Sequence, residues 1–321
     1  MNRAEDLRIG LRSILIQTKP PKEVTIVDDS DNSRTMDMID EMHRDFSDKG
    51  ITLVYLRGGK KEEKSISRAR NVGAAQSTGA IILFMDDDVI LDQEYLKEIL
   101  EFFSTHPEAV GVQGHITNMV ESISGKHRLL SVFYNKIFFL FHTEKDRCRL
   151  LPSGHITYPD FLSGVIESEW MSGTNSNYRT EVLKKHKWDE NLKEWSRFED
   201  VDISNRILKH YPNSLYMIPN AKVIHKYSSV ARRNAKQLVY IMTLYHTYFF
   251  LKNVEQKTFN RIAFVWSQFG DSLETLFFLY KGESRLDILR FLIGSYLFML
   301  NHFNEVRSGD FAGARTFLKS A

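Results

Sequence analysis

The chain of 321 residues is 42% hydrophobic and 26% charged, a length that allows one large domain or one domain with a sizeable appendage. Its net charge of +2 excludes a strong general attraction to nucleic acid. The single cysteine, Cys148, excludes an internal disulfide framework, and the charged first residues lack the apolar core of a signal peptide. We therefore expect a cytoplasmic protein in a reducing compartment.

Helix and strand patterns alternate through the first half of the chain. Apolar residues at helical spacing, Leu7, Leu11 and Ile14, predict a helix that ends before Pro20. The apolar run 80–85 predicts a strand buried on both faces. Further strands are expected at 24–29, 51–56 and 109–113, and further helices at 67–76 and after Asp92. This alternation predicts right-handed βαβ units and an α/β fold with a mostly parallel, Rossmann-like central sheet flanked by helices.

The second half of the chain divides into three parts. Residues 117–170 break the alternating pattern, which returns at about 170–226, so we interpret them as an insertion. Beyond about 230 the spacing of apolar residues predicts three or four amphipathic helices. We therefore expect a first domain at 1–228 that contains the insertion, followed by a helical region at 229–321.

The helical region and an apolar patch in the insertion, Val132–Phe141, indicate contact with a membrane surface. Phe259–Tyr280 is apolar along one helical face but contains Arg261, Asp271 and Glu274, and each central charge would cost about 2.5–3.5 kcal/mol in a bilayer. We therefore expect peripheral attachment rather than a membrane span. Basic residues suited to anionic head groups precede these helices, namely Arg232, Arg233 and Lys236. The alternative is that the helices pack on the first domain or on a second subunit, forming an oligomer.

Three consecutive acids, Asp86, Asp87 and Asp88, directly follow the buried strand 80–85. Open α/β sheets bind their ligands at the carboxyl ends of their strands. Two like charges about 4 Å apart repel by on the order of 4 kcal/mol near a protein surface. A bound divalent cation relieves this repulsion, and carboxylate oxygens suit Mg²⁺ or Mn²⁺. The alternative is a solvated acidic turn.

Two further acidic pairs lie at the ends of predicted elements. Asp28 and Asp29 end a second strand, where carboxylates can accept hydrogen bonds from a base or a ribose, although a capping turn is an equal alternative. Glu199 and Asp200 begin a helix, where they either cap it or supply a general base worth roughly 10²–10⁴-fold in rate. His225 ends another strand and is either a metal ligand, a phosphate contact or a structural histidine.

Together these segments resemble glycosyltransferase family 2, which has the GT-A fold, and in particular its bacterial rhamnosyltransferase-like members of polysaccharide biosynthesis. The matching segments occur in the family's order at 2–7, 13–18, 27–30, 67–73, 86–88, 172–175, 188–190, 199–200 and 219–225. No single segment is specific to the family. The occurrence of so many of them in the family's order, over about residues 2–226, is specific.

The resemblance implies roles for the acidic residues and their neighbours. The implied donor contacts are Asp28, Asp29, Arg70, Asp86 and Asp87. The implied ligands of a Mg²⁺ or Mn²⁺ cofactor are Asp88, Asp86 and His225. The implied catalytic residues are Asp200, as the base, and its neighbour Glu199.

The function that the resemblance implies is inverting, metal-assisted transfer of a sugar from a nucleotide-diphosphate donor to a hydroxyl group. The expected acceptor is a lipid-linked or polysaccharide glycan, reached from the inner face of the plasma membrane. Two alternatives remain open, a catalytically inactive protein that binds nucleotide sugars and a nucleotidyltransferase.

One feature of the family is missing from this chain. Members begin with a buried strand before the helix that starts here at Asn2 and Arg3, but only Met1 precedes these residues. We therefore expect either a start further upstream or an incomplete sheet. An incomplete sheet would leave strand edges and their apolar neighbours unpaired.

Overall fold

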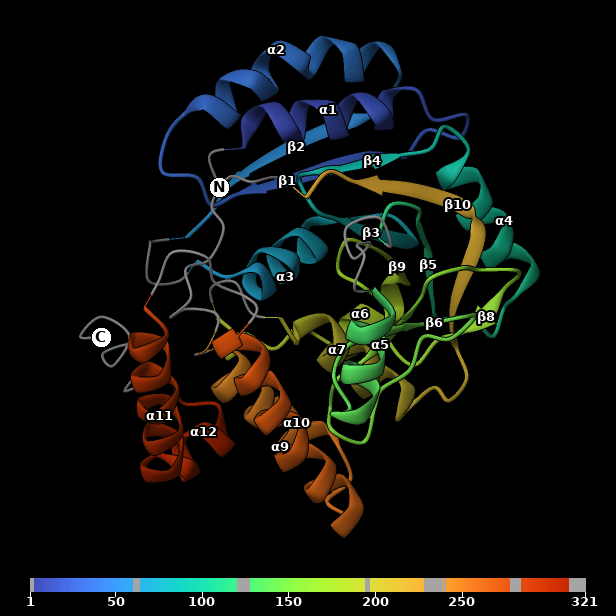
Figure 1. The fold of residues 1–321 in the computed structure, drawn as a ribbon. Helices are drawn as coiled ribbons and strands as arrows, with labels where there is room; N and C mark the ends of the chain where they lie inside the picture. The colour runs from blue at the N-terminus through green and yellow to red at the C-terminus, as the bar shows by residue number, and fades with distance from the viewer. Residues whose placement is uncertain are drawn as a thin grey trace.

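Helices cover both faces of a divided β-sheet in this chain (Figure 1). The structure is a computed structural model, and it describes residues 3–59, 64–119, 128–193, 197–227, 239, 241–277 and 284–311. One part of the sheet pairs β1 (Glu23–Asp28) in parallel with β2 (Thr52–Arg57). The other part has six strands in the order β3 (Ile81–Met85), β9 (Asn175–Arg179), β5 (Gly111–Ile116), β10 (Leu215–His225) and β4 (Val89–Leu91), with β8 (Ile166–Glu167) also on β10. Strands β6 (His142–Glu144) and β7 (Thr157–Pro159) form a small parallel pair.

Helices of the first half pack on these strands and match the sequence predictions closely. Helix α1 packs on β4, α2 on β2, α3 on β1 and α4 on β10. The bounds of the helices before residue 210 are α1 (Ala4–Leu15), α2 (Arg34–Asp48), α3 (Ile66–Gln76), α4 (Tyr95–Thr105), α5 (Arg128–Ile137), α6 (Thr180–Lys185) and α7 (Glu199–Leu208). The predicted helices at 7–15 and 67–76 are confirmed, and Ser65 caps the latter by accepting the N–H of Arg68 at 3.1 Å.

The α/β class with a central sheet flanked by helices is confirmed, but the sheet is mixed rather than mostly parallel. In the six-stranded part only the pairing of β5 with β10 is parallel among the described strands, and the other four pairings are antiparallel. Two of the four arise from β9, which runs between β3 and β5 in the opposite direction, and the other two from β4 and β8, which run antiparallel to β10. The polar residues of β9 are buried because Asn175 and Asn177 donate side-chain hydrogen bonds to carbonyls of β5, each at 3.0 Å. Such a polar segment shows no strand pattern in the sequence.

Apolar clusters cover both faces of the six-stranded part. On one face Leu11 and Ile99 join a large apolar cluster with side chains from β5 and β10. On the other face Phe84, Tyr178 and Ile207 belong to a second cluster beneath α6 and α7. Because β3 lies between these two clusters, all of its residues are apolar, as expected for a strand that is covered on both faces.

The chain beyond residue 240 is helical, as predicted. It contains a π-helical turn, η3 (Ile241–Tyr245), and then α9 (His246–Asn253), α10 (Thr258–Phe277), α11 (Arg285–Asn301) and α12 (Phe303–Ser308). Within the described ranges none of the helices has both the length and the apolar character that a bilayer span requires. Arg232, Arg233 and Lys236 lie outside the described residues. The division into domains at residue 228 stays a prediction.

A cavity of about 920 Å³ lies between β1 and β3. It is lined by Val24–Asp28 of β1, by Ile81–Met85 of β3 and by Leu7 and Leu11 of α1. Among the described strands β1 pairs only with β2, and β3 only with β9, so no described strand occupies the space between them. An opening between the two strands therefore runs along both of them in the described part of the chain.

We predict that an extended apolar segment can fill this cavity. A six-residue segment of alternating Val and Ile, fused ahead of residue 1, should raise the unfolding temperature by about 5 °C or more, because it would bury apolar surface and pair two open strand edges. Differential scanning calorimetry measures the change. A control segment with proline at its two central positions cannot pair and should have little effect. Equal stabilisation by both segments would contradict the prediction.

Candidate active site

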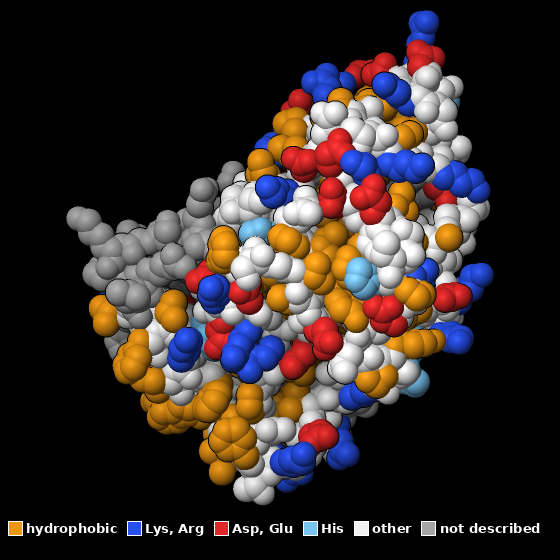
Figure 2. Space-filling model, turned by 90° about the vertical axis from the view of Figure 1, so that its right-hand side faces the viewer, with side chains coloured by type: hydrophobic (Ala, Val, Ile, Leu, Met, Phe, Trp, Pro, Cys, Tyr) orange, Lys and Arg blue, Asp and Glu red, His pale blue; other side chains and the backbone are white. Residues whose placement is uncertain are grey.

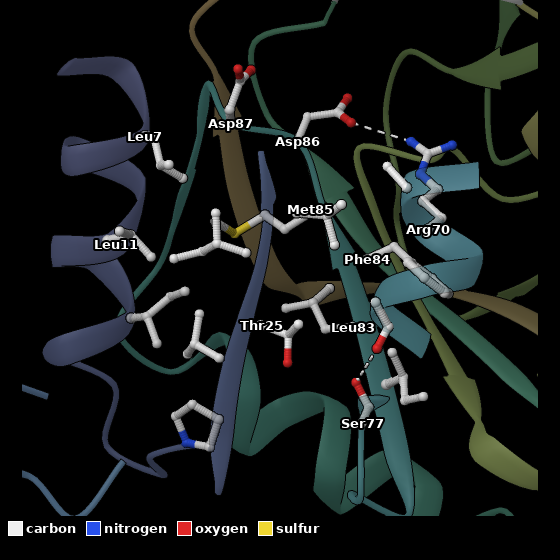
Figure 3. Close-up of a pocket in the computed structure, with 18 of the residues that line it drawn as sticks. Leu7, Leu11, Thr25, Arg70, Ser77, Leu83, Phe84, Met85, Asp86 and Asp87 are labelled. Atoms are coloured by element: carbon white, nitrogen blue, oxygen red, sulfur yellow. Dashed lines mark hydrogen bonds and ion pairs between the residues drawn. The ribbon is translucent and has the colours of Figure 1, made fainter. Parts of the chain in front are cut away.

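Acidic and basic side chains gather where β1, β3 and β10 end (Figure 3). Seven of the nine residues predicted from the sequence line the same cavity, namely Asp28, Asp29, Arg70, Asp86, Asp87, Asp88 and His225. The other two, Glu199 and Asp200, begin α7 and are joined to this group through Arg70. The structure therefore brings together side chains that are up to about 200 residues apart in the sequence.

Arg70 on α3 connects the acids that follow β3 with those that begin α7. Its guanidinium donates to Asp86 Oδ1 at 3.2 Å, shown as a dashed line in Figure 3, and to Glu199 Oε1 at 3.2 Å. The ring of Trp188 lies 4.4 Å from the guanidinium carbon, a cation–π contact that fixes the side chain from one side. Arg70 is buried, so these contacts are only weakly screened by solvent.

Asp86, Asp88 and His225 form a group that fits a divalent cation. One ligand atom from each lies within 4.8 Å of the others. His225 Nε2 is 3.0 Å from Asp88 Oδ1. Burial alone would lower the pKa of His225, but the hydrogen bond and charge of Asp88 raise it overall. Two carboxylates and one imidazole suit Mn²⁺ or Mg²⁺, so the residues fit the predicted ligand set, which stays a prediction.

Arg3 supplies a second cation to the acids after β3. Its Nη1 atom is 3.0 Å from Asp87 Oδ1 and 3.5 Å from Asp88 Oδ2. Burial raises the pKa of Asp87, and the charge of Arg3 opposes that rise. The sequence analysis assigned Arg3 only to the opening helix, because its contact with the acids joins residues 84 positions apart and has no local signal.

Asp28 and Asp29 have different surroundings at the end of β1. Asp28 is buried and accepts the N–H of Ser30 and the hydroxyl of Tyr55, each at 2.8 Å. Asp29 is partly exposed, and burial raises its pKa although the charge of Lys64 lowers it. Asp28 therefore shapes the turn, and of the two Asp29 is the better placed to contact a ligand in the cavity.

Asp200 has the properties of a general base. Its Oδ2 accepts the N–H of Gly173 at 3.1 Å and its Oδ1 accepts the N–H of Val201 at 2.8 Å. Burial, together with the negative charge of Glu199, raises the pKa of Asp200 to about 7. A carboxyl group with a pKa near neutrality can exchange a proton readily at physiological pH.

Known proteins resemble this chain in sequence. A family model described as glycosyl transferase family 2 matches residues 1–162, half of the chain. A glucosyl-dolichyl phosphate glucuronosyltransferase of Haloferax volcanii is 28% identical over 116 residues, 36% of this chain and 35% of that protein. A poly-beta-1,6-N-acetyl-D-glucosamine synthase of Staphylococcus epidermidis is 25% identical over 114 residues, 36% of this chain and 26% of that protein. The chain thus spans about a third or less of the length of these relatives.

Solved structures resemble it in fold. Residues 1–349 of S. aureus TarS in complex with UDP give a TM-score of 0.52 at 16% identity, covering 99% of this chain and 88% of that one. The mannosyltransferase PcManGT from Pyrobaculum calidifontis, in complex with GDP-Man and Mn²⁺, gives 0.52 at 13% identity, covering 98% of this chain and 83% of that one. These similarities confirm the predicted GT-A fold.

We predict that the position of Arg70 depends on the absence of a side chain at residue 173. A Cβ at Gly173 would lie 2.2 Å from an Arg70 guanidinium nitrogen, so Gly173→Ala should displace Arg70 from its two acids. The free energy of unfolding, measured in urea, should fall by about 1–3 kcal/mol. A Cβ at Gly164 would meet no atom within 4 Å, so Gly164→Ala is the matched control and should be neutral. Similar losses in both variants would argue against a special role for Gly173.

Proposed function

This chain belongs to glycosyl transferase family 2, and we propose that it transfers a sugar from a nucleotide-diphosphate donor to a hydroxyl acceptor with inversion at the anomeric carbon. The observation that carries the proposal is the bridge made by Arg70. It contacts Asp86 of the group that fits a cation and Glu199, the neighbour of the candidate base. A leaving diphosphate bound near Asp86 and an acceptor hydroxyl bound near Glu199 and the candidate base would therefore lie next to each other.

The donor would lie at the end of the cavity where β1 and β3 end, outside the apolar space between the two strands, with its diphosphate at the group formed by Asp86, Asp88 and His225. These residues would hold Mg²⁺ or Mn²⁺, which neutralises charge on a leaving diphosphate. Asp29 would accept a hydrogen bond from the nucleoside. The structural neighbours support a nucleotide-linked donor and a divalent cation, because TarS was solved with UDP and PcManGT with GDP-Man and Mn²⁺.

Asp200 would act as the base in a single displacement. The acceptor oxygen forms a bond to the anomeric carbon while the bond from that carbon to the diphosphate oxygen breaks. The proton of the acceptor hydroxyl passes to Asp200, and the electron pair of the broken bond leaves with the diphosphate. Attack from the face opposite the leaving group inverts the anomeric centre. Arg70 would hold Glu199 in place beside the base.

For the acceptor we propose a lipid-linked or polysaccharide glycan at the inner face of the plasma membrane. Two relatives support this class by name, one as a glucosyl-dolichyl phosphate glucuronosyltransferase and the other as a polysaccharide synthase. The alternatives are a protein that binds nucleotide sugars without turning them over and a nucleotidyltransferase. A carboxyl group with a pKa raised to about 7, linked to the candidate cation site through Glu199 and Arg70, favours sugar transfer over both.

The product released from a nucleotide sugar distinguishes these three functions. We expect the purified chain, incubated with a panel of UDP-, GDP- and dTDP-sugars and Mn²⁺, to release nucleoside diphosphate. Chelation with EDTA should stop the release, and Asp88→Ala should prevent Mn²⁺ from restoring it, because Asp88 is one of the three proposed ligands. Release of pyrophosphate would instead indicate nucleotidyl transfer. Donor binding without either product would indicate an inactive binder.

The pH dependence of turnover tests the role of Asp200. Because the base must be deprotonated and burial raises its pKa to about 7, kcat/KM should rise through pH 7 and level off at higher pH. Asp200→Asn should lower kcat by at least roughly 10²-fold and remove this rise. The variant should not be less stable at pH 8, since a raised pKa means that the charged form is unfavourable in the folded state. Unchanged turnover in Asp200→Asn would exclude it as the base.

A further inference from the structure

Several large apolar side chains of helix α10 are exposed, whereas several of its polar side chains are buried. Ile262, Val265 and Phe269 are 62%, 67% and 52% exposed. Gln268 and Asp271 are each only 7% exposed, and Ser267 is fully buried. At 100° per residue these two sets occupy opposite faces of one helix. The arrangement is the reverse of that expected for a helix on the surface of a water-soluble domain.

Buried hydrogen bonds hold α10 in this orientation. Asp271 Oδ2 lies 2.9 Å from His155 Nε2 of the segment before β7. Gln268 Nε2 lies 2.8 Å from His246 Nδ1 at the start of α9. Rotating the apolar face of α10 inward would break both contacts and leave buried polar groups unpaired. The outward position of the apolar residues is therefore part of the fold.

Helix α5 extends the exposed apolar surface of α10. The indole N–H of Trp266 donates to the carbonyl of Ile137 at 2.9 Å, and the rings of Trp266 and Phe138 stack at 4.8 Å. The hydroxyl of Tyr134 also donates to the carbonyl of Gly270 at 2.7 Å. These contacts hold α5 beside α10. On α5, Leu130 is 68% exposed and Phe133 is 65% exposed. We call the exposed apolar residues of the two helices the α5–α10 surface.

Cations on both helices indicate what covers this surface. Lys136 of α5 and Arg261 of α10 are exposed, and within the described part of the chain neither forms an ion pair. Lys257, in contrast, is paired with Glu255. Figure 2 shows hydrophobic side chains gathered at the lower end of the molecule, at the height of the C-terminal helices, with Lys and Arg side chains next to them. Apolar groups beside unpaired cations complement the acyl chains and anionic head groups of a membrane.

We propose that the α5–α10 surface docks on an anionic lipid leaflet, with the apolar residues of both helices among the acyl chains. Lys136 and Arg261 then contact lipid phosphates. A second copy of this chain is the weaker alternative, because it would bring a second set of these cations to the same interface. The inference does not rest on sugar transfer, and vesicle binding without a donor tests it separately.

Sedimentation with vesicles tests the proposal on the full chain. The wild type should bind vesicles of phosphatidylglycerol and phosphatidylcholine at least tenfold more tightly than phosphatidylcholine alone, since each cation contributes roughly fivefold. Ile262→Glu/Val265→Glu should abolish binding. The control Ile16→Glu/Met36→Glu adds the same charges at two exposed apolar sites, one directly after α1 and one on α2, and should bind like the wild type. Lys136→Ala/Arg261→Ala should remove most of the preference for the anionic vesicles.

Fluorescence quenching gives a second measurement that does not depend on how the charged variants fold. Vesicles with brominated acyl chains should quench part of the tryptophan emission of the wild type, because Trp266 is partly exposed on the docking surface. Trp266→Phe should lose that quenched component. Equal binding to neutral and anionic vesicles, or none to either, would overturn the proposal. A soluble dimer that Ile262→Glu/Val265→Glu dissociates would show that the surface joins two copies instead.

Discussion

The site depends on one buried guanidinium with a carboxylate on either side. Arg70 lies between Asp86, which follows β3, and Glu199, which begins α7. Without this cation, the acids from the two elements would repel one another in a poorly solvated space. With it, Glu199 is paired while its neighbour Asp200 keeps a pKa raised to about 7 by burial and by the charge of Glu199. A carboxyl group whose pKa lies near neutrality thus stands beside a carboxylate that already has a cationic partner, an arrangement suited to acid–base chemistry.

The sequence could predict the acids of this site but not what holds them. Short-range patterns predict the positions of both groups of acids. Asp86–Asp88 directly follow a strand, and Glu199–Asp200 begin a helix. The partners of Arg70 lie 16 and 129 residues away, and its stacking on Trp188 leaves no periodic signal. The same limit applies to β9, whose buried Asn175 and Asn177 donate side-chain hydrogen bonds to carbonyls of another strand. Residue types and their spacing indicate chemistry, whereas the pairing of distant groups is decided by the fold.

Helix α10 shows a different limit of sequence reasoning. The sequence correctly places apolar residues such as Ile262, Val265 and Phe269 along one face, but it cannot say which way that face points. Its direction is set by polar partners from other segments, His155 before β7 and His246 on α9. An apolar face is ordinarily directed inward because apolar burial stabilises a fold. Here two buried polar contacts fix the opposite orientation, and the apolar face is left available for a partner.

The acids after β3 also have to keep their place beside a cavity that separates β1 from β3. Helix α1 makes this possible because it is anchored from the far side, by hydrogen bonds to β4 and the turn that follows it. Ser13 Oγ accepts the N–H of Leu91 at 3.1 Å, and Gln17 Nε2 donates to the carbonyl of Asp92 at 2.7 Å. With α1 fixed in this way, Arg3 at its start reaches the acids without any pairing between β1 and β3. The geometry of the candidate cation site is therefore supported by β4 and α1, and occupation of the cavity should affect stability more than the positions of the acids.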